Sequence, residues 1–180
     1  MFFYTADFSS LCHSIIDKYI LDKSLAIDAT LGNGFDTDFL SSRFKKVIAF
    51  DIQKTACDFY NTKKNENVLV INDSHHKFEN YINEEVNCII YNLGFLPGGD
   101  KNITTLYETS LASIKSGLNL LKNEGLMLIV VYRGHEQGEK EESIILEYLL
   151  SLNKHKFSVM KHEIINRSSK SPMLFVIEKK

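Results

Sequence analysis

Apolar positions follow two alternating patterns along this chain, one typical of helices and one typical of buried strands. Between residues 8 and 20, apolar side chains recur every three or four positions, which predicts an amphipathic helix. Short apolar runs predict seven strands, over residues 25–29, 46–51, 67–73, 86–92, 125–132, 156–166 and 172–180. Helical patterns separate the first six strands, over residues 34–44, 53–64, a short segment after 73, 103–121 and 141–152.

Repeated strand–helix units predict an α/β fold with a mostly parallel seven-stranded sheet and helices on both faces. The last two strands have no helix between them, so they form a C-terminal antiparallel pair. Ligands of such sheets bind beyond the carboxyl ends of the strands, where the strand order reverses. Functional residues are therefore expected immediately after each strand.

Length and composition indicate the number of domains and the cellular compartment. The 180 residues, 44% hydrophobic and 24% charged, fit one domain over 1–180, with an N-terminal helix over 1–22 packed on it. We see no leader sequence and no apolar run of the roughly 20 residues that span a bilayer. Three widely spaced cysteines are typical of reduced thiols, so we expect a cytoplasmic protein that uses no membrane and no metal.

The loop after the first strand, DATLGNGFDT, contains two glycines that let the backbone turn tightly and approach a ligand. Asp28 ends the strand, Gly32 and Gly34 form the loop, and Asp36 and Thr37 begin the next helix. Many strand–helix turns have two glycines for steric reasons alone. The loop therefore becomes informative only together with the residues that end the other strands.

The second strand ends at Asp51, 17 residues after Gly34. An acid in this place typically accepts hydrogen bonds from both hydroxyls of a ribose, which predicts an adenosine-containing cofactor. The dinucleotide pattern G-x-G-x-x-G would require glycine where this chain has Thr37. A polar, partly acidic loop suits S-adenosylmethionine better, because that cofactor has a positive sulfonium and no phosphate.

The loop after the third strand, NDSHH, would flank the adenine. Asp73 could accept a hydrogen bond from the adenine amino group, and Ser74 or His75 could line the ring. The alternative is that Asp73 or Ser74 caps the helix that follows.

The loop after the fourth strand reads NLGFLPGG. Enzymes that methylate amines on bases often have Asn/Asp-Pro-Pro-Tyr/Phe in this place, where the Asn carbonyl and a backbone carbonyl accept hydrogen bonds from the amine and the aromatic ring stacks on the base. Asn92 and Phe95 keep the ends of that pattern, whereas Leu93 and Gly94 replace the two prolines. Pro97, with the two glycines after it, would hold the loop in a non-helical shape. A purely structural loop is the alternative.

Two further features concern proton transfer and RNA contact. His135 follows the fifth strand, and with Glu136 and His75 it is a candidate base for an amine that must lose a proton. The net charge is −2, but residues 154–180 have seven Lys/Arg and two Glu, a local charge of +5. That stretch is either an RNA-facing edge or a solvated surface.

These stretches together resemble the YtqB-like (MnmM-type) family of rRNA methylases. The match runs from about residue 24 to the C-terminus and is carried by six segments: DATLGNGFDTDFL, FDIQ, NDSH, NLGFLPGGDKNITT, VVYRGHEQGEKEE and PMLFVIEKK. The resemblance implies a Rossmann-like class I methyltransferase with S-adenosylmethionine as donor. It also implies a tRNA anticodon loop as partner and conversion of the wobble nucleoside 5-aminomethyl-2-thiouridine to its 5-methylaminomethyl form.

The resemblance also implies roles for individual residues. The cofactor loop would comprise Asp28, Gly32, Asn33, Gly34, Asp36 and Thr37. Asp51 and Gln53 would contact ribose and adenine, Ser74 and His75 would lie on the adenine side, and Asn92, Gly94 and Phe95 would form the acceptor loop. Phe95 stands where family loops often have Tyr, and Arg133 within VYRGH could contact phosphate.

Three alternatives stay open at this point. The acceptor could be an rRNA base or a small amine, the chain could be an NAD-dependent oxidoreductase, or it could bind RNA without catalysis. The chain has no separate RNA-binding domain, so RNA contacts would come from the rim of the site, the basic C-terminal strands or a second subunit in a homodimer.

Overall fold

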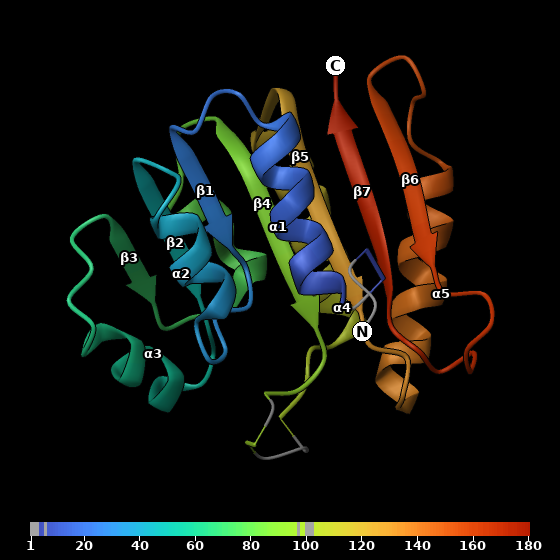
Figure 1. Cartoon of the computed structure of the whole chain (residues 1–180), viewed down its shortest axis with the longest axis horizontal. Coiled ribbons are helices and arrows are strands. Elements are labelled where there is room, and N and C mark those ends of the chain that lie inside the picture. The colour runs from blue at the N-terminus through green and yellow to red at the C-terminus, as the bar shows by residue number, and fades with distance from the viewer. Residues whose placement is uncertain (1–3, 6, 97, 100–102) are drawn as a thin grey trace.

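The computed structural model describes residues 4–5, 7–96, 98–99 and 103–180, and it shows seven strands in one sheet (Figure 1). The spatial order is β3-β2-β1-β4-β5-β7-β6. The strands are β1 (Leu25–Asp28), β2 (Lys46–Phe50), β3 (Val68–Ile71), β4 (Val86–Leu93), β5 (Leu121–Val131), β6 (Phe157–Glu163) and β7 (Met173–Lys179). Pairing from β3 to β5 is parallel, so the predicted α/β fold is confirmed.

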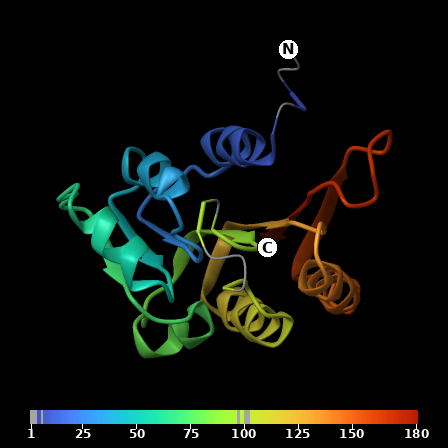
Figure 2. The ribbon, with the colours of Figure 1, turned by 90° about the horizontal axis from the view of Figure 1, so that it is seen from below.

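Helices cover both faces of the sheet. They are α1 (Phe8–Tyr19), α2 (Phe35–Ser41), α3 (Lys54–Asn61), the 3-10 helix η1 (His75–Asn80), α4 (Tyr107–Leu120) and α5 (Glu136–Leu150). Figure 2 shows α1 and α2 on one face and α4 and α5 on the other. Alternate residues of the central strands therefore enter two separate cores: Ile89 packs toward α4, and Cys88 and Ile90 pack toward α1.

The chain reverses direction across the sheet between β1 and β4. After β1 it adds β2 and β3 on one side, and then it returns to place β4 on the other side of β1. Asp28 of β1 lies between Ala49 of β2 and Ile90 of β4 in the register. This is the strand-order reversal at which an α/β sheet binds its ligand.

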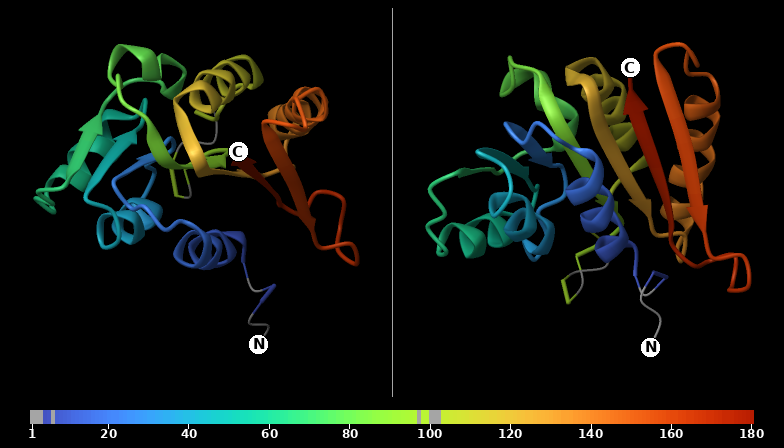
Figure 3. Two further views of the ribbon diagram at one scale, coloured as in Figure 1. Left: turned by 90° about the horizontal axis from the view of Figure 1, so that it is seen from above. Right: turned by 45° about the horizontal axis from the view of Figure 1, so that its top comes forward.

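The C-terminal strands confirm the predicted antiparallel pair. Strand β7 is antiparallel to both β5 and β6, so β6 runs in the direction of β5. The loop over residues 164–172 therefore lies at the same edge of the sheet as the carboxyl ends of the parallel strands (Figures 1 and 3).

Several element boundaries differ from the prediction. Strand β5 begins four residues earlier than expected, directly after α4, and α5 begins five residues earlier, at Glu136. Helix α4 begins at Tyr107 because the preceding residues are extended and Thr104 pairs with Phe95 in an isolated bridge. Pro97 lies outside the described residues. No described helix has the length and apolar character needed to cross a membrane.

Candidate functional site

A cavity of about 430 Å³ lies beyond the carboxyl ends of the parallel strands, at the strand-order reversal. The loops after β1, β2, β3 and β4 all contribute to its wall. Most of the predicted site residues line it, namely Gly32, Asn33, Asp36, Asp51, Gln53, Asp73, Ser74, His75, Asn92, Gly94 and Phe95. The remaining predicted residues, Asp28, Gly34, Thr37 and His135, do not line it.

Asp51 is fixed by two backbone groups. Its Oδ2 accepts a hydrogen bond from the Gly32 N–H at 2.9 Å, and its Oδ1 accepts one from the Gln53 N–H at 2.8 Å. Burial raises the pKa of Asp51, and these two hydrogen bonds act in the opposite direction. The carboxylate thus faces the cavity in one orientation, as a ribose diol requires, and its remaining lone pairs can accept hydroxyl protons.

The two glycines of the first loop serve different purposes. Gly32 has a φ of +50°, and a Cβ atom there would lie 3.3 Å from Leu96 Cδ1 across the cavity wall. Gly34 has a φ of +81°, and a Cβ atom there would lie 2.4 Å from Tyr60 Cδ2. Gly34 is therefore required by the packing of α2 against α3, whereas Gly32 lets the backbone border the cavity.

Asp28 and Thr37 are fully buried beneath the loop. The Thr37 hydroxyl donates to Asp28 Oδ2 at 2.6 Å, and the Thr30 N–H donates to Asp28 Oδ1 at 3.0 Å. Burial, followed by the charge of Asp36, raises the pKa of Asp28. The expectation that Asp28 and Thr37 touch a cofactor is corrected: they hold the first loop onto the start of α2 from below.

The loop after β3 combines a hydrogen-bonded aspartate with an uncharged histidine. Asp73 accepts hydrogen bonds at 2.8 Å from the Ser74 N–H, the Lys77 ammonium and the Tyr81 hydroxyl, and Lys77 is the main reason that its pKa falls to about 2. Burial lowers the pKa of His75 to about 4. His75 is thus neutral at pH 7 and is not a useful base, contrary to one expectation. Its Nδ1 is buried without a hydrogen-bond partner in the described part of the chain.

Asn92 lines the cavity and has one side-chain acceptor that is buried without a partner in the described part of the chain. Its backbone N–H donates to Thr30 Oγ1 at 2.7 Å, and its side-chain Nδ2 donates to Asp36 Oδ2. Its Oδ1 is buried and has no partner among residues 4–5, 7–96, 98–99 and 103–180. A buried acceptor without a partner costs free energy, so a ligand with N–H donors would be stabilised there.

Asp36 connects the acceptor loop to the N-terminal helix. Its Oδ1 is 2.6 Å from the Nε2 of His13, and the His13 ring is stacked on Phe39 at 3.8 Å. His13 was not predicted, because a lone histidine on an amphipathic helix has no motif around it.

The far wall of the cavity comes from the segment before α4. Thr105 lines the cavity, and its N–H donates to the Gly94 carbonyl at 3.0 Å. The hydroxyls of Thr105 and Ser110 donate to the buried Glu141 of α5 at 3.0 and 2.5 Å. Burial raises the pKa of Glu141. The hydrogen bond from Thr105 to Glu141 was not predicted, because it joins residues that are 36 positions apart. Further lining residues that were not predicted include Ser9, Phe35, Thr109 and Tyr132.

His135 and Arg133 have structural contacts. His135 caps α5, since its Nδ1 accepts from the Gly138 N–H at 3.1 Å, and its ring centroid is 5.9 Å from that of Phe95. Arg133 is buried, donates to the Ser171 carbonyl at 2.7 Å, and pairs with Glu163 at 2.8 Å. Arg133 therefore ties the 164–172 loop to Glu142 of α5 instead of contacting phosphate. His135 does not line the cavity, its Nε2 is buried without a partner among the described residues, and its role as a base stays a prediction.

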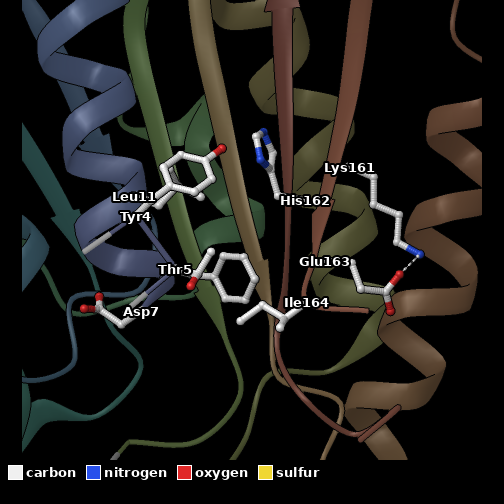
Figure 4. A pocket seen from close by; sticks show the side chains of 9 residues that line it. Tyr4, Thr5, Asp7, Leu11, Lys161, His162, Glu163 and Ile164 are labelled. Carbon is white, nitrogen blue, oxygen red and sulfur yellow. Dashed lines mark ion pairs between the residues drawn. The ribbon is translucent and has the colours of Figure 1, made fainter. Parts of the chain in front are cut away.

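A second cavity of about 260 Å³ lies between the start of α1 and the end of β6 (Figure 4). Tyr4 and Leu11 face His162 and Ile164 across it. Lys161, at its rim, is paired with Glu163 at 2.9 Å, so the basic charge of this strand is partly neutralised locally. The described residues hold no group of three or more His, Cys, Asp or Glu placed to bind a metal ion.

Comparison with known proteins decides the family. The family model described as "Putative rRNA methylase" matches residues 47–178. The chain belongs to this rRNA methylase family. One relative is the "tRNA (mnm(5)s(2)U34)-methyltransferase, chloroplastic" of Arabidopsis thaliana. It is 30% identical over 95% of this chain and 69% of its own length.

Solved structures agree with the family. A "putative rRNA-methylase" from Clostridium thermocellum has a TM-score of 0.89 at 33% identity, covering 94% of this chain and 96% of its own. A "putative methyltransferase" from Streptococcus mutans, solved in complex with SAH, has a TM-score of 0.85 at 36% identity with the same coverage. The Rossmann-like class I methyltransferase fold expected from the sequence is thereby confirmed.

Proposed function

We propose that this protein is an S-adenosylmethionine-dependent N-methyltransferase that acts on the wobble uridine of tRNA. Its substrate would be 5-aminomethyl-2-thiouridine, and its product would be 5-methylaminomethyl-2-thiouridine. The proposal is supported by family membership, by the printed activity of the Arabidopsis relative, and by a cavity whose polar groups match both a nucleoside cofactor and an amine.

One observation carries the choice of an amine acceptor. Asn92 Oδ1 is buried at the cavity wall without a partner in the described chain, and the amide nitrogen beside it is held by Asp36. A carbonyl oxygen accepts hydrogen bonds from N–H groups, and it offers nothing to a carbonyl or a ring nitrogen that lacks a proton. An aminomethyl group donates such bonds and then directs its lone pair into the cavity.

The residues on the cofactor side fit S-adenosylmethionine. Asp51 would accept from the ribose hydroxyls, and neutral His75, with its unpartnered Nδ1, would accept from a donor of the adenine side. When bound, this cofactor supplies an electrophilic methyl group: the S–C bond breaks as the N–C bond forms, its electron pair stays on sulfur, and the positive charge moves to nitrogen. The residues of the chain would position the two reactants and exclude water, which lowers the barrier to methyl transfer. The departing sulfur needs no proton, so no acid or base has to act on it.

The RNA would lie across the rim of the cavity. Phe95 is 38% exposed at this rim and can stack on the target base. The 164–172 loop lies at the same edge and contains the exposed Arg167 and Lys170, which could contact phosphates. A homodimer that extends this surface remains a proposal. So does a cytoplasmic location, since the Arabidopsis relative is named as chloroplastic.

A methyltransferase acting on an rRNA base is the second candidate, because the family description names rRNA. The oxidoreductase alternative has no support, because the family and the structural relatives are methyltransferases.

The test is a methylation assay with nucleoside mass spectrometry. The protein is incubated with S-adenosylmethionine and tRNA that bears 5-aminomethyl-2-thiouridine, and in parallel with ribosomal RNA. We expect one methyl group on the wobble nucleoside and none on rRNA. Methylation of rRNA alone would favour the second candidate, and absence of both activities and of cofactor binding would overturn the proposal.

A further inference from the structure

We infer that His13 and Asp36 form a positioning pair that makes the acceptor side of the cavity selective for an amine. The inference rests on the proposed function, and it assigns a role to the N-terminal helix α1, which lies outside the segment matched by the family model. The two residues are 23 positions apart and come together only in the fold.

Asp36 fixes the orientation of the Asn92 amide. The two ends of an amide are nearly equal in shape, so its orientation follows from its hydrogen bonds. A carboxylate accepts only, which means that the NH2 end of Asn92 must face Asp36 Oδ2. Rotation of the amide by 180° would bring two oxygens into contact. Asn92 Oδ1 is thereby directed away from Asp36, as a fixed and buried acceptor of a residue that lines the cavity.

His13 fixes Asp36 in turn. Its Nε2 lies 2.6 Å from Asp36 Oδ1, so each carboxylate oxygen has a different partner and the carboxylate cannot rotate freely. The His13 ring is itself held by coplanar stacking on Phe39, with an interplanar angle of 3°, and the guanidinium of Arg43 covers the same Phe39 ring at 4.7 Å. The chain of contacts therefore runs from the surface of α1 and α2 to the cavity.

The Asp36 carboxylate matches the change of charge on the acceptor during the reaction. Positive charge develops on the acceptor nitrogen, and Asp36 lines the cavity beside Asn92. A carboxylate placed there stabilises an amine that becomes an ammonium. A hydroxyl acceptor must instead lose a proton and become more negative before or during attack, and the same carboxylate disfavours that. The site is thus built for nitrogen acceptors.

The test compares four variants in methylation of 5-aminomethyl-2-thiouridine tRNA: His13→Ala, His13→Gln, Asp36→Asn and the control His155→Ala, which changes an exposed histidine far from the cavity. We expect His13→Ala and Asp36→Asn to lower kcat by about 10²-fold, because a misplaced reacting group costs about that much. KM for tRNA and affinity for SAH should change little. His13→Gln keeps an N–H donor and should recover much of the loss, while the control should match the unmodified protein.

A second readout does not depend on substrate. In NMR spectra of the protein alone, the Asn92 side-chain NH2 protons should exchange slowly with water, and in His13→Ala and Asp36→Asn they should exchange faster. Unchanged exchange and unchanged kcat in both variants would overturn the inference. If the unmodified protein fails to methylate this tRNA, the proposed function fails, while the exchange data still decide whether His13 and Asp36 hold the amide.

Discussion

The two halves of the cavity are built in different ways. On the cofactor side, Asp51 is held by backbone N–H groups of Gly32 and Gln53, all within the loops that follow β1 and β2. On the acceptor side, Asn92 is held by the side chains of Asp36 and Thr30, which come from other parts of the chain. Hydrogen bonds from backbone N–H groups persist when most residues are substituted. A hydrogen bond from a side chain is lost when that one residue is substituted.

This difference implies that the halves can be damaged separately. Changes on the cofactor side should lower cofactor affinity and leave the chemistry intact once the site is filled. Changes on the acceptor side should lower kcat while the cofactor binds normally.

The largest effect is expected for Asn92→Ala. Loss of one preorganised hydrogen-bonding group in a transition state typically lowers kcat by about 10²- to 10³-fold. Steady-state kinetics with modified tRNA measures this, and calorimetry with SAH should give an unchanged affinity. Asn61→Ala, at the exposed end of α3, is the matched control. Full activity of Asn92→Ala would remove the acceptor role from this loop.

A pH effect on stability is expected from His75. Its pKa is about 4 in the folded protein, below its ordinary value of 6.5. The unfolded chain therefore takes up this proton first as the pH falls. Relative to His75→Gln, the protein should lose up to about 3 kcal/mol of unfolding free energy between pH 6.5 and 4, and nothing above pH 7. Urea unfolding of both proteins measures this difference. The pKa values of Asp51 and Glu141 are raised in both proteins, so their effects on the unfolding free energy cancel in the comparison. A constant difference across this range would show that His75 is not buried as described.

Asp51→Asn should weaken SAH binding by about 10²-fold, because it removes the charge from two hydrogen bonds to the ribose. Calorimetry measures the affinity, and kcat at saturating cofactor should stay within about threefold if the two halves are independent. Asp58→Asn, in an exposed ion pair with Lys54, is the control. A large loss of kcat at saturation would instead show that the halves are coupled.

The smallest effect is expected for Phe95→Leu. Stacking of a base on an aromatic ring contributes about 1–3 kcal/mol, so KM for tRNA should rise by about tenfold or more. Phe95→Tyr keeps the ring and should retain the affinity. Equal losses in both variants would contradict the stacking role of Phe95.

Local patterns predicted which strand-end loops line the cavity. The strand-end positions of Asp51 and Asn92 follow from the alternation of strands and helices, because parallel strands place their carboxyl ends together. The same reasoning misplaced Asp28 and Thr37, whose polar side chains face each other beneath the loop. Sequence position alone does not tell whether a polar residue at a strand end points up into a cavity or down into the protein.

Long-range contacts could not be predicted in the same way. His13 reaches Asp36 from another helix, and Glu141 reaches Thr105 from α5. The capping role of His135 was not predicted, although a histidine before a helix can accept from that helix's own backbone, as it does from Gly138. A buried arginine such as Arg133 likewise finds internal partners that no short motif reveals.

The most direct test of the central claim is a crystal structure with SAH and an anticodon stem-loop that carries 5-aminomethyl-2-thiouridine. The account predicts that the aminomethyl nitrogen lies about 3 Å from Asn92 Oδ1, the distance of an N–H···O hydrogen bond. Asp36 should still hold the other end of the amide. An amine seated elsewhere, with Asn92 Oδ1 turned away from it, would contradict the account.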